Sequence, residues 1–411
     1  MEKLTAELPL HSTPDAEPSY WKRRVAGLIT GGLIAFYGLT HIPCRTHDPV
    51  EEVLRLQPLT DGHNDFPFFL REFYHNHIYQ SNFSDTIDLP YHVDFPRLAQ
   101  GRLRGQFWSV FIPCNDSDAT PTPIPNYEYI RDTLQQIDIV HRLASLYPNH
   151  LEIVPDSTAF QQTFHTTSRI ASFIGVEGLH QISSSASTLR LYHSLGVRYT
   201  TLTHVCHNEF ADSASPSEPL HNGLSPAGHA IVLEMNRLGM AVDLAHVSAK
   251  TMHDALDTSR APVIFSHSSV YGLCPHPRNV PDDVLRRLAR NGGVIMITFF
   301  PEYTRCDDPD SATLSDVADH IQYVGDLIGY QYIGLGSDFD GMEKTIKGLE
   351  DVSKYPDLIK ELLARGVSVR DVAGVIGGNV LRVMGDVERV AEEMRAEGVT
   401  PMEDDVKGYY E

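Results

Sequence analysis

The sequence predicts an α/β fold, a (β/α)8 TIM barrel, and three observations support this prediction. Short apolar runs rich in β-branched and aromatic residues recur along the chain, and polar residues follow them. Helical patterns fill the stretches between these runs, and several of them stop at a glycine. Beyond residue 43, no Gly/Ser linker, low-complexity block or repeated motif divides the chain. Because strand and helix alternate eight times, we expect a parallel sheet closed into a barrel.

The predicted elements follow one another in order. Strands are expected at 58–60 (leading into Asp61), 106–112, 170–176, 197–203, 240–245, 262–266, 293–299 and 332–336. Helices are expected between them, for example at 127–147, 227–238, 282–289, 314–328 and 355–364. Left-handed glycine caps are expected at Gly196, Gly239, Gly292 and Gly329. The long segment 66–104 is then an insertion after the first strand.

Length and charge limit the classes of protein to consider. At 411 residues the chain is long enough for one large barrel with insertions. Its 33 Lys and Arg against 54 Asp and Glu give a net charge of −21, which repels a phosphate backbone and excludes nucleic acid as a partner. We expect the barrel domain at 55–390, after a linker at 43–54 and before an acidic tail at 391–411.

The N-terminal region has the pattern of a membrane anchor. A cytosolic tail at 1–24 is expected to end in Lys22-Arg23-Arg24, before an apolar run at 25–42. About 17–25 apolar residues span a bilayer as a helix, and basic flanks stay in the cytosol. We therefore expect a single-pass transmembrane signal anchor with the remaining chain extracellular or lumenal. The alternative is a cleaved signal peptide and a secreted protein. Glycosylation sequons at Asn82 and Asn115 agree with export.

Five cysteines stand at positions 44, 114, 206, 274 and 306. They form no CxxC motif and show no zinc-finger spacing. The pattern indicates buried thiols or widely spaced disulfides, and an exported domain makes their oxidation the expected outcome.

Polar side chains with metal-binding chemistry follow most of the predicted strands. Any one of them alone is weak evidence, because histidines and carboxylates commonly lie on surface loops. A barrel, however, brings the carboxyl ends of all its strands to one rim. The residues at these ends are His63, Asp65, Glu177, His204, His246, His267 and Asp338. The sequence therefore predicts that they meet in a single pocket.

This set of side chains predicts a centre of two metal ions. His63 and Asp65 leave the same face of an extended segment and can bind one metal together, although the same stretch also suits an ordinary turn. His246 and His267 supply the imidazoles expected for a second zinc ion. Glu177 can bridge two Zn²⁺ ions at the separation of about 3.5–4 Å that two-metal hydrolases use. No lysine stands at these strand ends, which argues against a carbamylated-lysine bridge.

The chemistry that these residues support is hydrolysis in a barrel of the metal-dependent hydrolase type. A water held between two Zn²⁺ ions is acidified to hydroxide, so that no serine or cysteine nucleophile is needed. Asp338 can take and return the proton, and Asp340 competes for this role. His204 can donate to the developing oxyanion. Arg278 can hold a substrate carboxylate with its guanidinium fork, unless it is an ordinary surface arginine.

Seven short motifs run in the same order as in a known family. They are Asp61-Gly62-His63-Asn64-Asp65, Val176-Glu177-Gly178, Leu202-Thr203-His204, Asp243-Leu244-Ala245-His246-Val247-Ser248, Ser266-His267-Ser268, Arg278-Asn279-Val280-Pro281-Asp282-Asp283 and 336–341. Taken together, the chain from about residue 55 to residue 385 resembles the membrane (renal-type) dipeptidase family of zinc metallopeptidases, in a fungal-type form with an N-terminal membrane segment.

The resemblance implies a role for each matched residue. It implies zinc binding by His63 and Asp65, by His246 and His267, and by Glu177 as the bridge, with His204 and Arg278 contacting substrate and Asp338 transferring protons to it. It also implies disulfides Cys114–Cys206 and Cys274–Cys306, which leaves Cys44 either free or paired between two copies in a homodimer. Family members hydrolyse dipeptides, some with a D-residue at the C-terminal side, and some open β-lactams. Trimming of a Cys-Gly-type conjugate is a further candidate reaction.

Two other functions stay open at this stage. One is a different binuclear amidohydrolase-type barrel enzyme, which has no need of Arg278, and the other is a catalytically inactive membrane receptor of the same fold. The presence of every expected ligand counts against the inactive receptor. The chain departs from the family pattern at Leu179, where a second glycine is usual, and over 206–210, which replaces an Asn- and Trp-bearing stretch. These departures bear on specificity rather than on metal binding.

Overall fold

The computed structural model describes residues 48–114, 126–406 and 408, and a parallel sheet lies at its centre. The strand order is β1-β2-β4-β5-β6-β7-β8-β9, and the short β3 (Leu151–Ile153) pairs with β4 beside this path. The other strands are β1 (Thr60–Asn64), β2 (Gly105–Val110), β4 (Ile170–Glu177), β5 (Val197–Thr201), β6 (Ala241–Asp243), β7 (Ile264–Ser268), β8 (Val294–Ile297) and β9 (Ile333–Leu335). Each predicted run overlaps one of these eight strands, so the predicted barrel fold is confirmed.

Hydrogen bonds join the first strand, β1, to the residues that follow the last strand, β9. Asp61 of β1 accepts hydrogen bonds from the N–H and the hydroxyl of Ser337, just after β9, at 2.8 and 2.7 Å. Further along, the N–H of Asp65 donates to the carbonyl of Phe339 at 2.8 Å. The sheet is therefore nearly closed into a barrel at the end where β1 and β9 finish.

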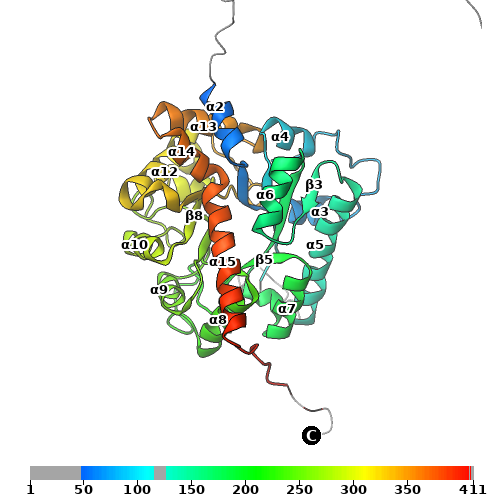
Figure 1. The fold of residues 1–411 in the computed structure, drawn as a ribbon, viewed down its shortest axis with the longest axis vertical. Coiled ribbons are helices and arrows are strands. Elements are labelled where there is room, and N and C mark those ends of the chain that lie inside the picture. The colour runs from blue at the N-terminus through cyan, green and yellow to red at the C-terminus, as the bar shows by residue number, and fades with distance from the viewer. Residues whose placement is uncertain (1–47, 115–125, 407, 409–411) are drawn as a thin grey trace, which may run out of the picture. The chain divides into compact units, whose positions relative to one another are not determined.

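Helices surround the barrel (Figure 1). They are α2 (Pro49–Leu56), α3 (Phe66–Tyr74), α4 (Phe95–Gln100), α5 (Asn126–Leu146), α6 (Ser157–Thr166), α7 (Ala186–Ser194), α8 (Pro226–Leu238), α9 (Ala249–Thr258), α10 (Asp282–Asn291), α11 (Pro301–Thr304), α12 (Leu314–Ile328), α13 (Tyr355–Ala364), α14 (Val369–Ala373) and α15 (Asn379–Ala396). Gly239 and Gly292 end α8 and α10 in the predicted left-handed conformation. Gly329, at the end of α12, has φ 103° and ψ 146°, outside that conformation, and Gly196, just after α7, has a positive φ of 104°.

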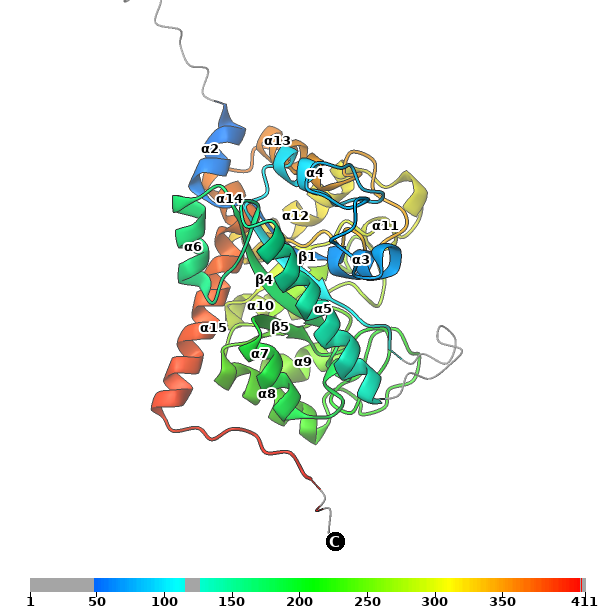
Figure 2. The same cartoon turned by 90° about the vertical axis from the view of Figure 1, so that its right-hand side faces the viewer.

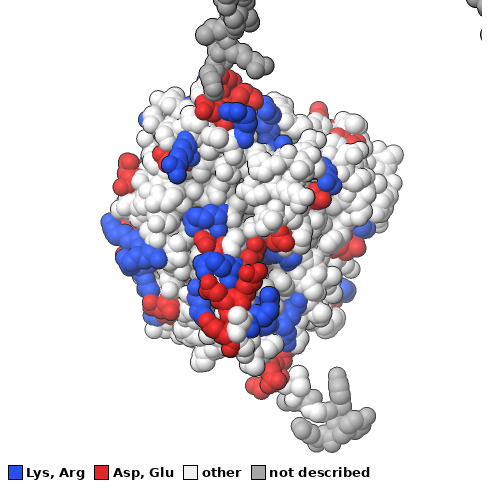
Figure 3. Space-filling model, viewed as in Figure 1, with Lys and Arg blue, Asp and Glu red and all other residues white. Residues whose placement is uncertain are grey.

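Helix α15 covers one end of the barrel. Figure 2 shows α15 at one edge, and α3 and α11, which follow β1 and β8, at the other. The apolar side of α15 packs into a buried cluster with strand residues such as Phe107 and Met296. Its outer side carries interspersed basic and acidic residues (Figure 3), among them the Arg389–Glu393 ion pair at 2.6 Å. The carboxyl ends of the strands therefore face away from α15.

The C-terminal region departs from the predicted domain boundary at residue 390, because α15 continues through that position to Ala396. The following residues lie along the barrel domain. Asp404 accepts hydrogen bonds from the N–H groups of Ala186 and Ser187 at the start of α7, at 2.6 and 3.0 Å. Unpaired N–H groups at a helix start favour such a carboxylate, so part of the acidic segment serves as a helix cap.

The predicted membrane location is corrected by the structure. Over 48–114, 126–406 and 408, no helix is long and apolar enough to cross a bilayer. The apolar run at 25–42 was the basis of that prediction, and it lies outside the described residues, as do Cys44 and Asn115. An apolar run of marginal length was therefore too weak a basis for the predicted location. Asn82, the other sequon, is exposed in a turn.

Candidate metal centre

The barrel brings the predicted polar residues together at the carboxyl ends of its strands. Their positions are His63 within β1, Asp65 just after it, Glu177 at the end of β4, His204 after β5, His246 after β6, His267 within β7 and Asp338 after β9. His246 and Asp338 have φ values of 65° and 68°, in a region that residues other than glycine seldom occupy. Such backbone conformations persist where the surrounding structure holds them, and they cluster at functional sites.

One group of residues, the carboxylate-rich half, consists of His63, Asp65, Asp338 and the Oε2 atom of Glu177. The Nε2 atom of His63 lies 3.4 Å from Asp65 Oδ2 and 3.6 Å from Glu177 Oε2. It also lies 3.8 Å from Asp338 Oδ1. Three carboxylates therefore surround one imidazole nitrogen.

The second group, the imidazole-rich half, consists of His204, His246, His267 and the Oε1 atom of Glu177. Oε1 lies 2.9 Å from the Nε2 atom of His246 and 3.3 Å from that of His267. The Nε2 atom of His204 is more distant, at 3.8 Å from the same oxygen. Glu177 thus directs one carboxylate oxygen toward each half.

The donor atoms of both halves fit a metal ion. The Nε2 atom of His63 and the Oδ1 atom of Asp65 are buried and have no hydrogen-bond partner among the described residues. Buried polar atoms are normally paired, so such atoms call for a ligand. Imidazole nitrogens and carboxylate oxygens are the ligands of catalytic zinc sites.

The structure also widens the set of candidate ligands. At this centre, three groups have ligand atoms within 4.8 Å of one another, and they are His63/Asp65/Glu177, Glu177/His204/His246 and His63/His267/Asp338. His204 and Asp338, which the sequence assigns to substrate contact and proton transfer, are therefore close enough to act as ligands. For Asp338, the zinc content of an Asp338→Asn variant separates the two roles.

The two halves differ in their electrostatics. Burial acts to lower the pKa of His63, but Tyr199 and the carboxylates of Glu177 and Asp65 outweigh it and raise this pKa well above its usual value. Burial lowers the pKa values of His246 and His267 well below their usual range. The imidazole-rich half therefore presents neutral rings, the form that binds metal.

Hydrogen bonds on the far side of the imidazole rings fix their orientation. The Nδ1 atom of His63 lies 2.8 Å from the hydroxyl of Tyr199. The Nδ1 atom of His267 lies 2.8 Å from Ser266 Oγ, whose hydroxyl donates to Asp243 Oδ2 at 2.6 Å. Because Asp243 accepts the Ser266 hydroxyl hydrogen, Ser266 Oγ accepts from His267 Nδ1–H. The Nε2 atom of His267, which lies 2.8 Å from Nε2 of His246, then has no hydrogen and can bind a metal ion. Sequence reasoning missed the role of these supporting residues, although Asp243 and Ser266 open the motifs that contain His246 and His267.

A cleft of about 250 Å³ opens over the two halves. Its polar floor includes Asp65, Glu177, His204, His246, Asp338 and Asp340. Aromatic residues also line the cleft. Phe68 and Phe111 lie in the segments that follow β1 and β2, and Phe300 and Tyr303 lie in the segment that follows β8. Apolar walls with few polar groups are typical of small-molecule sites.

Arg278 lies beside this cleft in the connection between β7 and α10. It is 3% exposed, and its guanidinium carbon lies 5.1 Å from the ring centre of Tyr303. Its Nε–H has no hydrogen-bond partner among the described residues. Because Arg278 is buried, it is not an ordinary surface arginine, and its unpaired donor can hydrogen-bond to an anion.

Asp338 and Asp340 differ in how the protein holds them. Asp340 Oδ1 accepts the N–H of His92 at 2.8 Å, and the N–H of Asp340 donates to His92 Nδ1 at 3.0 Å. Burial raises the pKa of both carboxyl groups well above the usual value, and His63 opposes this effect at Asp338. Asp338 is the one whose oxygen lies near His63, which favours it for chemistry at the centre.

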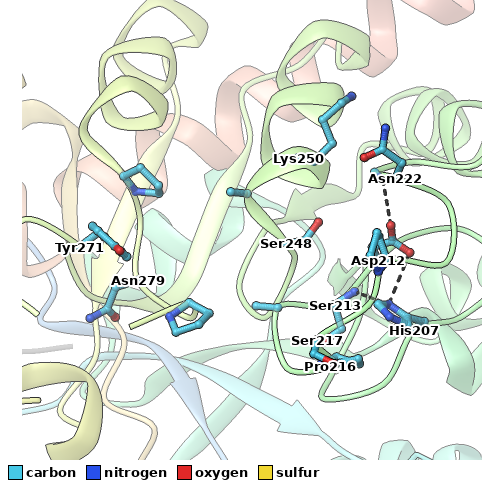
Figure 4. Close-up of a pocket in the computed structure, with 16 residues that line it drawn as sticks. His207, Asp212, Ser213, Pro216, Ser217, Asn222, Ser248, Lys250, Tyr271 and Asn279 are labelled. Carbon is cyan, nitrogen blue, oxygen red and sulfur yellow. Dashed lines mark hydrogen bonds and ion pairs between the residues drawn. The ribbon is translucent and has the colours of Figure 1, made fainter. Parts of the chain in front are cut away.

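A second cavity of about 340 Å³ lies outside the centre (Figure 4). Figure 4 shows His207 and Asp212 on one side of it and Tyr271 and Asn279 on the other. The carboxylate of Asp212 is not available to bind a ligand, because its oxygens accept hydrogen bonds from the backbone N–H groups of Leu220, His221 and Gly223. Ser213 in the same wall donates to the carbonyl of His204 at 2.6 Å. This wall therefore supports the centre from outside.

Two disulfides tie connections around the centre. Cys114, after β2, is joined to Cys206, two residues past His204, with a Cα–Cα distance of 6.2 Å. Cys274, in the connection that carries Arg278, is joined to Cys306 with a Cα–Cα distance of 5.3 Å. Both pairs are those that the family resemblance implies.

Comparisons with known proteins agree with this geometry. A family model described as "Membrane dipeptidase (Peptidase family M19)" matches residues 47–398. The chain is 54% identical over 415 residues to "Dipeptidase aclJ" of Aspergillus oryzae, and the alignment covers 97% of each chain. It is similar to the crystal structure of the probable dipeptidase PvdM from Pseudomonas aeruginosa, with a TM-score of 0.75 at 24% identity over 83% of this chain and 98% of that one. A metallo peptidase from Rhodobacter sphaeroides, liganded with a phosphinate mimic of the dipeptide L-Ala-D-Ala, has a TM-score of 0.71 at 24% identity over 80% and 99%.

Proposed function

Because the chain belongs to the membrane dipeptidase family, we propose that its barrel hydrolyses dipeptides at a centre of two zinc ions bridged by Glu177. The observation that carries this proposal is the position of Glu177. One of its carboxylate oxygens faces His63 and the other faces His246 and His267. A carboxylate that is shared in this way is the arrangement expected of a bridge between two cations.

Each residue at the cleft has a separate role in hydrolysis. Zinc ions held by His63, Asp65, Glu177, His246 and His267 would supply the acidification of a water molecule and the polarisation of the scissile carbonyl. Asp338 accepts a proton at its carboxylate and returns it to the leaving amine, since its carboxyl group borders the cleft. His204 donates a hydrogen bond to the carbonyl oxygen as negative charge develops there. Arg278 holds the terminal carboxylate of the substrate and so selects a free dipeptide.

The shape of the cleft bears on the substrate. A volume of about 250 Å³ with aromatic walls suits a molecule of dipeptide size. The Rhodobacter sphaeroides metallo peptidase is liganded with a dipeptide mimic that has a D-residue at its C-terminal side. By extension we include L-Xaa-D-Xaa dipeptides among the substrates, and we retain β-lactams and Cys-Gly-type conjugates as further candidates.

Arg278 also separates this proposal from the alternatives. An amidohydrolase-type enzyme that acts on neutral amides or bases has no need of a buried guanidinium beside its cleft, whereas a dipeptidase has a carboxylate to bind. An inactive receptor has no need of the ring orientation that Ser266 and Tyr199 provide. Both observations favour a working dipeptidase.

The test combines metal analysis with a substrate panel. We expect about two zinc ions per chain and hydrolysis of free L,L- and L,D-dipeptides, with little action on C-terminally amidated ones. Chelation should abolish hydrolysis, and added Zn²⁺ should restore it. Full activity with one zinc ion or none contradicts the two-metal centre. Preference for amidated substrates points to the amidohydrolase alternative, and metal binding without hydrolysis of any substrate points to the receptor. Including Cys-Gly, an S-substituted Cys-Gly and a β-lactam in the panel defines the finer specificity.

A further inference from the structure

A second cluster of potential metal ligands lies behind the wall of the cleft. It contains Cys114, Cys206 and His180, the last of which belongs to the short helix η1 (Leu179–Ile182) after β4. The two sulfur atoms and one ring nitrogen lie within 4.8 Å of one another. The proposed centre contains none of the three residues.

The imidazole of His180 is suited to a metal ligand. Its ring is 7% exposed, its Nε2 atom lies 2.8 Å from the carbonyl of Ile112, and its Nδ1 atom has no hydrogen-bond partner among the described residues. Burial lowers the pKa of His180 to about 4, so the ring is neutral at physiological pH. A neutral ring with one nitrogen held by a backbone carbonyl is the usual state of a histidine that binds a metal through the other.

We propose that reduction of the Cys114–Cys206 disulfide creates a third metal site, in which the two thiolates and His180 bind Zn²⁺ or a similar borderline-soft divalent cation. A thiol reductant supplies two electrons and two protons to the disulfide and is itself oxidised to a disulfide. Metal binding then releases the two thiol protons. A fourth position stays open to water, as in other three-ligand zinc sites.

Only small movements are needed for this change. Zinc–sulfur bonds of about 2.3 Å in a tetrahedral site place two sulfur atoms about 3.8 Å apart. The Cα atoms of Cys114 and Cys206 are 6.2 Å apart, and rotation of the side chains alone can separate the sulfurs by that amount. The disulfide and the metal therefore hold the same two segments together, one under oxidising and the other under reducing conditions. Because Cys206 follows His204 by two residues, either link keeps His204 at the centre.

The second disulfide provides a matched control. Cys274 and Cys306 are also joined, but no group of potential metal ligands among the described residues includes either of them. Reduction gives two thiols there as well, but neither they nor His276, two residues past Cys274, belong to a group of potential metal ligands among the described residues. The two pairs therefore share the same redox chemistry and differ in the proposed metal site.

Cobalt substitution tests the proposal directly. Zinc-loaded protein is treated with a phosphine reductant, both disulfides are shown to be open by thiol counting, and Co²⁺ is added. Thiolate–cobalt bonds give a charge-transfer absorption in the near ultraviolet that carboxylate and imidazole ligands do not give. We expect this band, and a further metal ion per chain, in reduced protein and not in oxidised protein. Absence of the band in fully reduced, folded protein overturns the proposal.

Variants then locate the site. We expect Cys206→Ser and His180→Gln to lose the band, or to require far more Co²⁺ to produce it, and Cys274→Ser to keep it after reduction. Circular dichroism establishes that each variant is folded, and if Cys206→Ser is not, Cys114→Ser and His180→Gln carry the test. Loss of the band in Cys274→Ser with its retention in Cys206→Ser places the metal at the other pair and overturns the proposal. Hydrolysis of a dipeptide by the zinc-loaded oxidised protein is measured in parallel, so that failure of the proposed function is seen separately.

Discussion

The two halves of the metal centre share Glu177 but are built from different chemistry. In the carboxylate-rich half, His63 stands among carboxylates, and its pKa is raised. In the imidazole-rich half, His246 and His267 face a single carboxylate oxygen, and burial lowers their pKa values. One half thus has more carboxyl groups and the other more nitrogen donors.

This difference indicates that the two halves have different functions. Oxygen-rich sites accept a wider range of divalent cations, whereas imidazole-rich sites favour zinc and later transition metals. The half with surplus carboxylates also contains Asp338, the candidate proton carrier, and Arg278 lies in the connection that follows β7 of the other half. We expect proton transfer to depend on the first half and binding of the substrate carboxylate on the second.

The largest expected effect comes from the residue that the halves share. Glu177→Gln replaces one carboxylate oxygen by an amide nitrogen that cannot bind a cation, so at least one zinc ion should be lost. We expect kcat/KM for a dipeptide to fall by about 10³-fold or more. Elemental analysis and steady-state kinetics measure both effects. Glu388→Gln, on α15 at the opposite end of the barrel, is the matched control and should retain both zinc ions. Unchanged zinc content in Glu177→Gln contradicts the bridge.

The next largest effect concerns proton transfer in the carboxylate-rich half. Asp338→Asn keeps the shape of the side chain but cannot carry a proton at neutral pH, so kcat should fall by about 10²–10⁴-fold. Zinc content and binding of a competitive inhibitor should be retained. If zinc is lost instead, Asp338 is a ligand, as its distance of 3.8 Å from His63 allows. If Asp338→Asn keeps full kcat and Asp340→Asn does not, Asp340 is the proton carrier.

Arg278 tests whether the substrate carboxylate lies on the imidazole-rich side. Arg278→Lys keeps the charge but loses the two-pronged hydrogen bond, so KM should rise by about 10–100-fold while kcat changes less. Amidation of the dipeptide's C-terminus should then harm the wild type far more than the variant. Arg286→Lys, on the outer face of α10, is the control and should resemble the wild type. Equal losses from amidation in both enzymes place the carboxylate elsewhere.

The smallest effects separate the two halves most cleanly. Tyr199→Phe removes the hydroxyl beside His63, and Ser266→Ala removes the one beside His267. Loss of such supporting hydrogen bonds typically weakens metal binding by about 10–100-fold. Zinc release to a chelator should become biphasic in both variants, with a different ion weakened in each. Identical release behaviour in the two variants shows that the halves are not independent.

The sequence predicted the barrel and the residues at its rim because both leave local signals. Buried parallel strands are apolar runs, and their carboxyl ends are followed by polar residues, so His204 and His246 could be placed before the structure was known. The first strand was predicted too short, at 58–60 instead of Thr60–Asn64. Its sequence is polar and suits a turn, yet all five residues are buried, with Ser337 hydrogen-bonded to Asp61 and Tyr199 hydrogen-bonded to His63.

Other features depend on contacts between distant parts of the chain and gave no local signal. The three residues of β3 are too few for a periodic pattern. Tyr199 has the appearance of an ordinary core aromatic, and its hydroxyl gains a role only because His63, 136 residues away, meets it in the fold. The proximity of His204 and Asp338 to the other ligand atoms is likewise a property of side-chain geometry, so the sequence could name these residues but not rank their roles.

The closure between β1 and β9 has a consequence for how the protein is made. Asp61 and Ser337 are 276 residues apart in the chain, and His63 and Asp65 are almost as far from Asp338. Ribosomes extend a chain at about 5–20 residues per second, so Asp338 is synthesised on the order of tens of seconds after His63 and Asp65. Throughout that interval β1 has its last neighbour missing, and its polar residues lack the groups that satisfy them. Assembly of the centre is therefore a late step in folding, and metal capture marks the completion of the barrel rather than its beginning.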